Sequence, residues 1–189
     1  MAEKHKIAIF ASGTGSNFEA IAKAAIDGRI DAEVALLVSD RPSARVCEVA
    51  KELGIETFAF CAKDYDSKQE YEAAIVERCQ MAEVELICLA GYMRLVGETL
   101  LSAYEGKIIN IHPSLLPAFK GKDAIKQAFN YGVKVYGVTI HYVDMSLDGG
   151  QIIAQQAFNY NGDNINELET MFHAVEHTLY INTIREILK

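Results

Sequence analysis

Asn110 and His112 stand two positions apart in a segment whose residue types could carry out acid–base chemistry. The apolar run 107–109 before them, bounded by Gly106 and Pro113, predicts a buried strand. On an extended backbone, residues two apart point to the same face, so the amide and the imidazole are expected side by side. Such a pair can polarise and protonate a developing oxyanion. A histidine near a strand end is more often structural, so the pair alone does not establish catalysis.

The loop 144–150 offers a carboxylate to this pair. It contains Asp144 and Asp148 and ends in two glycines. Asp148 taken alone is typical of a turn, but it could equally orient His112 and favour its charged form. A metal site built from His112, His141 and Asp148 matches no known ligand spacing, so we expect none. No serine or cysteine stands in an elbow-like or histidine-paired context, which argues against covalent catalysis.

The segment Ser12-Gly13-Thr14-Gly15-Ser16-Asn17 predicts an anion-binding turn. It follows the apolar run 6–11, which predicts a first strand, and it precedes a helical apolar pattern that ends near Gly28. A strand, a glycine-rich turn and a helix aim free backbone N–H groups at a phosphate. The turn is not a Walker motif, and Phe18 stands where the dinucleotide fingerprint has its third glycine. A tight turn that only requires positive φ is the alternative.

The composition is that of a single-domain globular protein. Its 189 residues predict one domain, 1–189, with a substantial core, and 50% of them are hydrophobic. The net charge of −8 argues against a nucleic-acid partner, whereas small anions can still bind at helix N-termini. The cysteines show no paired or metal-binding spacing, and no apolar run approaches a signal peptide or a membrane span. We therefore expect a cytoplasmic protein with reduced thiols and no membrane partner.

Strand and helix patterns alternate along the chain. Further strands are predicted at 32–38, 56–60, 84–90, 135–143 and 151–158, and further helices at 44–53, 68–82, 124–129 and after Asn164, which with Glu167 resembles a capping box. This rhythm predicts an α/β fold: a Rossmann-like, mostly parallel twisted sheet with helices on both faces. The link between the last two strands is too short for a helical crossover, so they are expected to form an antiparallel C-terminal pair. Ligands bind at the carboxyl ends of parallel strands, where 12–17, 91–96 and 110–112 converge.

Four segments together resemble the folate-dependent formyltransferase family. They are Ser12-Gly13-Thr14-Gly15-Ser16-Asn17, Leu89-Ala90-Gly91-Tyr92-Met93-Arg94, Asn110-Ile111-His112-Pro113-Ser114-Leu115-Leu116-Pro117 and Leu147-Asp148-Gly149-Gly150. The resemblance covers nearly the whole chain in order, and the opening turn resembles that of the phosphoribosylglycinamide formyltransferases of purine biosynthesis. Lys120 and Ile181 stand where many members have proline, which leaves the catalytic positions unaffected. The resemblance implies a single-domain formyltransferase fold over residues 1–189.

The resemblance also implies which residues form the site. The catalytic positions are Asn110, His112 and Asp148, and the substrate-binding positions are Gly15, Ser16 and Asn17 for the phosphate and Glu176 for the ribonucleotide. The folate-binding positions are Lys68, Met93, Arg94, Leu95, Val96, Asn110, Asp144, Met145, Ser146, Leu147 and Asp148. Lys68 stands where some members have an arginine near the folate tail, and it keeps the charge without the bidentate geometry.

The reaction implied is direct transfer of the formyl group of 10-formyltetrahydrofolate, a co-substrate, to the amine of glycinamide ribonucleotide. Asn110 and protonated His112 would stabilise the tetrahedral oxyanion. Asp148 would keep His112 charged and help position a water that shuttles protons. No metal is required, and the protein is expected to be a monomer or a homodimer that binds these small molecules.

Three other functions remain open from the sequence. Another folate-dependent formyltransferase, such as one acting on methionyl-tRNA, would share the catalytic trio but should carry an extra C-terminal domain and a basic surface. A formyltetrahydrofolate hydrolase would share the trio too, with a further N-terminal domain. A non-catalytic nucleotide-binding module would leave the set of Asn110, His112 and Asp148 unexplained.

Overall fold

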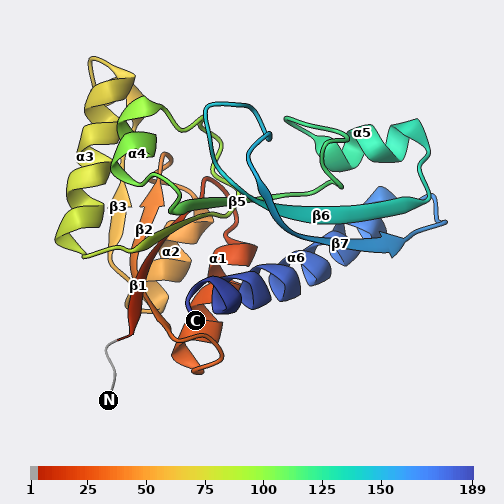
Figure 1. Ribbon diagram of the computed structural model, residues 1–189, viewed down its shortest axis with the longest axis horizontal. Helices are drawn as coiled ribbons and strands as arrows, with labels where there is room; N and C mark the ends of the chain where they lie inside the picture. Colours follow the sequence, from red (N-terminus) through yellow and green to blue (C-terminus); the bar gives the residue numbers. More distant parts are fainter. Residues whose placement is uncertain (1–3) are drawn as a thin grey trace.

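The computed structural model describes residues 4–189, which form one seven-stranded sheet with helices on both faces (Figure 1). The strands are β1 (His5–Phe10), β2 (Ala32–Ser39), β3 (Thr57–Ala59), β4 (Leu86–Leu89), β5 (Ile108–His112), β6 (Val135–Tyr142) and β7 (Ile152–Asn159). The helices are α1 (Ser16–Ile26), α2 (Arg45–Glu52), α3 (Lys68–Met81), α4 (Glu98–Ala103), α5 (Ala124–Tyr131) and α6 (Ile165–Ile187), with a 3-10 helix, η1, at Ala62–Asp64.

The sheet has the predicted α/β topology. Its strand order is β3-β2-β1-β4-β5-β6-β7, and all pairs among β1 to β5 are parallel. β6 pairs antiparallel with both β5 and β7, as the short connection between β6 and β7 requires. The chain leaves β1 toward β2 on one side and later returns to β4 on the other, so the carboxyl end of β1 is a topological switch point. A ligand site is therefore expected at this edge.

The elements differ from the sequence prediction mainly in length. β3 has three residues and β4 has four, because only the segments that pair with β2, β1 and β5 are counted as strand. The helix α4 and the 3-10 helix η1 were not predicted; α4 has six residues, too few to show a helical apolar period. The strands β1, β2, β5, β6 and β7 and the helices α1, α2, α3, α5 and α6 lie where the sequence patterns placed them.

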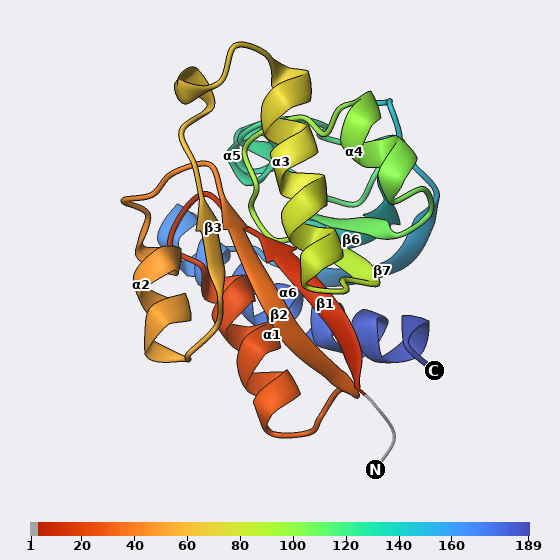
Figure 2. The same cartoon turned by 90° about the vertical axis from the view of Figure 1, so that its left-hand side faces the viewer.

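Two hydrophobic clusters fill the two faces of the sheet. Side chains from α1, α2 and α6 form the first cluster, and side chains from α3 and α4 form the second. Figure 2 shows α3 and α4 together on one side of β1, β2 and β3, with α1 and α2 on the other. Consecutive residues of a strand point to opposite faces, so Ile7 and Ile9 join the first cluster and Ala8 and Phe10 the second. Burial on both faces explains why β1 is apolar throughout. Within residues 4–189, no helix is both long and apolar enough to cross a membrane.

The start of α6 is capped by a variation on the predicted capping box. The side chain of Asn164 accepts the backbone N–H of Asn166 at 3.0 Å, as expected of an N-cap residue. Glu167 does not reach back to the backbone of Asn164. It accepts instead from the hydroxyl of Tyr160 at 3.0 Å, and that hydroxyl accepts the N–H of Asn164 at 3.1 Å. The hydroxyl of Tyr160 thus accepts the N–H of Asn164, which Glu167 would accept in a capping box.

Tyr180 of α6 joins the end of β4 to the neighbouring strand β5. Its side chain is fully buried, and its hydroxyl lies 2.9 Å from the carbonyl oxygen of Leu89 and 3.3 Å from that of Ile109. A buried tyrosine hydroxyl requires a polar partner, and here it finds two backbone acceptors on neighbouring strands. Leu89 ends β4, and Ile109 directly precedes Asn110. The last helix therefore holds the backbone from which the candidate site is built.

Candidate active site

The predicted catalytic residues meet at the end of β5. Asn110 and His112 both lie on this strand, and the antiparallel register places them opposite His141 and Thr139 of β6. Asp148 comes from the loop after β6, and its side chain is 11% exposed. The structure thus brings the trio together from two segments that the sheet joins.

The amide of Asn110 is oriented by His141. Its Nδ2 lies 3.2 Å from Nε2 of His141, whose Nδ1 lies 2.8 Å from the carbonyl oxygen of Tyr142. Burial lowers the pKa of His141, which favours the neutral ring. A neutral ring that donates its Nδ1–H to Tyr142 has a lone pair at Nε2, and this lone pair accepts one N–H of Asn110. The second amide N–H is then available to a substrate oxygen.

Both ring nitrogens of His112 face protein oxygens. Its Nε2 lies 2.9 Å from the carbonyl oxygen of Phe119, and its Nδ1 lies 3.5 Å from Oδ2 of Asp148. Because a carbonyl only accepts, Nε2 carries a proton, and a second proton at Nδ1 gives an imidazolium that faces the carboxylate. Donation to a substrate requires the exchange of one of these acceptors.

The carboxylate of Asp148 accepts from the loop before α5 and lies near strand β6. Its Oδ2 accepts the backbone N–H of Gly121 at 2.7 Å, and its Oδ1 lies 3.9 Å from Nε2 of His141. The backbone of Asp148 has φ 46°, a left-handed conformation that costs a non-glycine residue about 1–2 kcal/mol. A Cβ added at Gly150 would lie 1.8 Å from the carbonyl oxygen of Tyr142. The loop can therefore pass this close to the end of β6, on its way to β7, only with glycine at position 150. These constraints hold the carboxylate beside His112.

Large apolar side chains are exposed on the two loops that the sequence assigned to the folate. Met93 and Leu95, in the loop after β4, are 64% and 68% exposed, and Met145 and Leu147, in the loop after β6, are 73% and 53% exposed. Apolar side chains left in water are typical of a surface that a ligand or partner completes. The loop after β6 is tied by Asp144, whose carboxylate accepts both the backbone N–H (2.8 Å) and the hydroxyl of Ser146.

The side chains of residues 93–96 alternate between the surface and the interior. Val96 packs against the second hydrophobic cluster, and Nε of Arg94 donates to Oδ2 of Asp40 at 3.0 Å. Met93, which precedes Arg94, and Leu95, which lies between Arg94 and Val96, point outward. The guanidinium of Arg94, which the sequence assigned to the folate, is therefore engaged by the protein, and the backbone and neighbours of Arg94 are left to meet a ligand.

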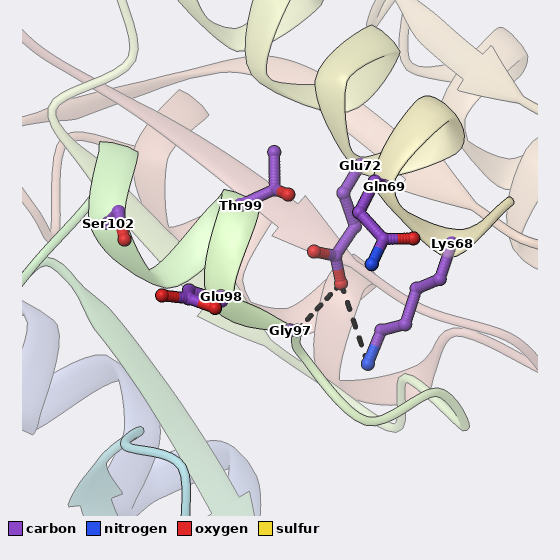
Figure 3. Close-up of a pocket in the computed structure, with 7 residues that line it drawn as sticks. All are labelled: Lys68, Gln69, Glu72, Gly97, Glu98, Thr99 and Ser102. Atoms are coloured by element: carbon purple, nitrogen blue, oxygen red, sulfur yellow. Dashed lines mark hydrogen bonds and ion pairs between the residues drawn. The ribbon is translucent and has the colours of Figure 1, made fainter.

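Lys68 lies in a hollow of about 190 Å³ between α3 and α4 (Figure 3). Its ammonium is 3.7 Å from Oε1 of the buried Glu72, whose carboxylate also accepts the backbone N–H groups of Gly97 at 2.6 Å and Leu100 at 3.4 Å. These two N–H groups lie at the start of α4 and have no acceptor within that helix, so the carboxylate of Glu72 caps the helix. Among residues 4–189, no hydrogen bond or ion pair joins Lys68 to the catalytic trio. Gly97, the last residue of the loop 91–97, lines this hollow.

The turn before α1 requires glycine for two reasons. Gly15 is the N-cap residue of α1 and has φ 81°, which L side chains rarely adopt. A Cβ added at Gly15 would lie 2.5 Å from Cγ2 and 3.1 Å from Cα of Val46. The N–H groups of Ser16 and Asn17 then begin the helix as free donors, because the first turn has no intrahelical acceptor for them.

Glu176 of α6 meets this turn. The Nδ2 of Asn17 donates to Oε2 of Glu176 at 3.1 Å, and Nδ1 of His173 lies 3.2 Å from the same oxygen. Oδ1 of Asn17 and Nε2 of His177 are buried and have no hydrogen-bond partner in the described chain. Buried polar atoms are almost always satisfied, so these two point to a polar ligand or water between α1 and α6.

The ion pair of His173 and Glu176 should make stability depend on pH. The hydrogen bond with Glu176 raises the pKa of His173 above 6.5. A raised pKa in the folded state contributes stability that is fully present below the unfolded value and is lost as pH rises through the folded value. We expect wild type to melt at a higher temperature than His173→Gln at about pH 5.5, and the difference to vanish by about pH 9. An equal difference in melting temperature at both pH values would contradict a stabilising ion pair between His173 and Glu176.

Some functional side chains were not identified from the sequence. His141 was considered only as a metal ligand, yet it orients Asn110, and the signal was its place on a strand that pairs with β5. Asp40 and Glu72 were not considered, because nothing in their local sequence distinguishes a buried carboxylate from a surface one. Within the described residues, no group of three or more His, Cys, Asp or Glu side chains is placed to hold a metal ion.

Comparison with known proteins identifies the family of the chain. Residues 5–184 match the family described as formyl transferase. The chain is 54% identical over 184 residues to the phosphoribosylglycinamide formyltransferase of Bacillus subtilis (strain 168), covering 97% of this chain and 94% of that protein. It superposes with a TM-score of 0.96 on the crystal structure of glycinamide ribonucleotide transformylase 1 from Geobacillus kaustophilus, with 52% identity and coverage of 98% and 100%. The trifunctional purine biosynthetic protein adenosine-3 of Gallus gallus is 39% identical over 178 residues, which are 94% of this chain and 18% of that protein. The chain therefore belongs to the formyl transferase family and, within it, to the phosphoribosylglycinamide formyltransferases.

Proposed function

We propose that the chain transfers the formyl group of 10-formyltetrahydrofolate to the amine of 5'-phosphoribosylglycinamide. The products are formylglycinamide ribonucleotide and tetrahydrofolate, in de novo purine biosynthesis. Membership of the family supports the reaction. The observation that carries it is the meeting of Asn110, His112 and Asp148 at the end of β5, near the switch point of the sheet.

Each substrate has a proposed site. The phosphate of the ribonucleotide binds the N–H groups at 15–17, and Glu176 contacts the rest of that molecule; the unsatisfied Oδ1 of Asn17 supports this placement. The folate ring lies between the exposed apolar side chains of 93–96 and the loop 144–148. Lys68, in the hollow that continues from Gly97, offers a cation to the acidic tail of the folate.

The chemistry follows from the orientation of the trio. The amine nitrogen forms a bond to the formyl carbon, and the formyl oxygen becomes an oxyanion. Asn110 donates its free amide N–H to that oxyanion, and the imidazolium of His112, charged beside Asp148, stabilises it electrostatically. The bond from the formyl carbon to N10 of the folate then breaks, and N10 gains the proton that the amine loses. Asp148 positions the water that carries this proton.

Replacing Gly15 with alanine should weaken ribonucleotide binding by about ten- to a hundredfold, because the added Cβ meets Val46 and moves the turn away from the phosphate. Folate binding should change little. Titration calorimetry with each ligand measures both affinities. The matched control is Gly28→Ala at the far end of α1: Gly28 also has positive φ (71°), but nothing lies within 4 Å of its Cβ position. Equal losses for both ligands in Gly15→Ala would reject the phosphate assignment.

A direct assay tests the proposed function. Purified protein is mixed with 10-formyltetrahydrofolate, with and without glycinamide ribonucleotide, and the folate absorbance is followed. Release of tetrahydrofolate that requires the ribonucleotide supports the transfer. Release without it indicates a hydrolase, formylation of another amine indicates a related formyltransferase, and binding without turnover indicates a nucleotide-binding module.

The wider setting is proposed on the same basis. The partners are the two small-molecule substrates, without nucleic acid or membrane, and the enzyme acts in the cytoplasm as a monomer or homodimer. The net charge of −8 supports the exclusion of nucleic acid, because a phosphate backbone requires a basic surface. Analytical ultracentrifugation distinguishes the two assembly states.

A further inference from the structure

Asp40 is a buried carboxylate that the proposed chemistry does not use. It directly follows β2 at the carboxyl edge of the sheet, and its side chain is 6% exposed. Its two oxygens have different partners: Oδ1 accepts from the hydroxyl of Ser12 at 2.5 Å, and Oδ2 accepts from Nε of Arg94 at 3.0 Å. Burial of a charge is costly unless it is paired, so this arrangement is a specific one.

Ser12 connects the carboxylate to the backbone of the loop after β4. Its single hydroxyl proton goes to Asp40, because an ionised carboxylate can only accept. A lone pair of the same hydroxyl accepts the backbone N–H of Met93 at 2.9 Å, and the N–H of Ser12 donates to the carbonyl oxygen of Gly91 at 3.1 Å. The loop is therefore fixed at two backbone groups, 91 and 93, by one buried residue.

Arg94 provides the third attachment. Besides its bond to Asp40, its guanidinium lies over the ring of Tyr71, 5.4 Å from the centroid. Arg94 is directed inward, whereas its neighbours Met93 and Leu95 point outward. The exposure of these two apolar side chains is thus a consequence of the buried contacts on either side of the backbone.

We propose that Asp40 is a positioning residue that sets the conformation of the loop 91–96 and thereby the affinity for the folate. This rests on the proposed function, in which that loop encloses the folate ring. Ser12 and Arg94 are the two arms through which Asp40 acts. We expect Asp40 to change the affinity for the folate and not that for the ribonucleotide. Ser12 precedes the turn 13–17, but the polar contacts of its side chain are with Asp40 and Met93.

Replacing Asp40 with alanine should raise the KM for 10-formyltetrahydrofolate by about ten- to a hundredfold, the usual effect of losing a hydrogen bond to a charged group. The KM for the ribonucleotide should stay within about threefold, and kcat should change less than the folate KM. Ser12→Ala leaves the ion pair of Asp40 and Arg94 intact and removes the acceptor of the Met93 N–H. It should raise the folate KM in the same direction.

Two variants serve as controls. Asp40→Asn should restore part of the binding, because its carbonyl can accept from Arg94 while its amide donates to the second lone pair of Ser12, whose own proton then loses its acceptor. Asp27→Ala removes the carboxylate of an exposed pair with Arg29, 3.6 Å apart at the end of α1, and should leave both KM values unchanged. Circular dichroism melting shows whether each variant is folded.

The outcomes separate this proposal from the proposed function. Titration with tetrahydrofolate by calorimetry reports the loop directly, even where no transfer occurs. Selective loss of folate affinity in Asp40→Ala and Ser12→Ala, with partial rescue in Asp40→Asn, supports the positioning role. A lower melting temperature with unchanged KM values, or equal rises of both KM values, overturns it. Absence of transfer in wild type overturns the proposed function instead.

Discussion

Asn110→Ala should lower kcat by about a hundred- to a thousandfold, because it removes one preorganised donor to the oxyanion. The amide is held by Nε2 of His141, so in wild type its free N–H is in place before the substrate arrives. An interaction made only in the transition state lowers kcat and kcat/KM together and leaves substrate affinity unchanged. Steady-state kinetics with both substrates measures this split.

The isosteric variant Asn110→Asp separates the donor from the shape of the side chain. A carboxylate fills the same space but only accepts, and its charge repels an oxyanion, so its kcat should fall at least as far as that of alanine. Calorimetry should show that both variants still bind the two ligands. Near-normal turnover in Asn110→Ala would refute the role of the amide.

Asp148→Asn should lower turnover by about a hundred- to ten-thousandfold, the range of acid–base contributions. Asparagine can still accept the N–H of Gly121, so the loop should keep its shape while the charge beside His112 is lost. The loss of this charge removes the electrostatic support that the carboxylate gives to His112 and to the water that carries the proton. Steady-state kinetics measures kcat, and calorimetry checks that both ligands still bind.

Asp144→Asn is the matched control for this loss of turnover. Asp144 lies in the same loop, and its carboxylate binds Ser146. Its loss can weaken folate binding but should leave kcat nearly unchanged. Near-normal turnover in Asp148→Asn would show that the charge of Asp148 is not required.

The sequence predicted the parts of the site that follow from local periodicity. β5 could be recognised as a buried strand, and the spacing of Asn110 and His112 placed them on one face. The glycine turn before α1 could be placed because a strand, a turn and a helix follow one another. Family resemblance then supplied Asp148, which local pattern alone could not distinguish from a turn residue.

The parts that were missed depend on long-range pairing. His141 meets Asn110 only because of the register between β5 and β6, and a shift by one residue would turn it to the other face. The side chain of Arg94 points inward to bind Asp40, which lies 54 residues earlier in the chain. Glu72 is buried because the start of α4 lies over it, and α4 is itself too short to predict. Such contacts are properties of the assembled sheet.

The position of α6 in the chain has a consequence for the nascent protein. Tyr180 supplies the hydroxyl that joins Leu89 to Ile109, and Glu176 supplies the carboxylate that meets Asn17. The ribosome makes these residues after every strand of the sheet, at about 5–20 residues per second. Until α6 docks, the strand ends around Asn110 and the turn before α1 lack their partners. The turn before α1 and the backbone around Asn110 therefore gain these contacts only after the whole sheet has been translated and α6 has docked on it.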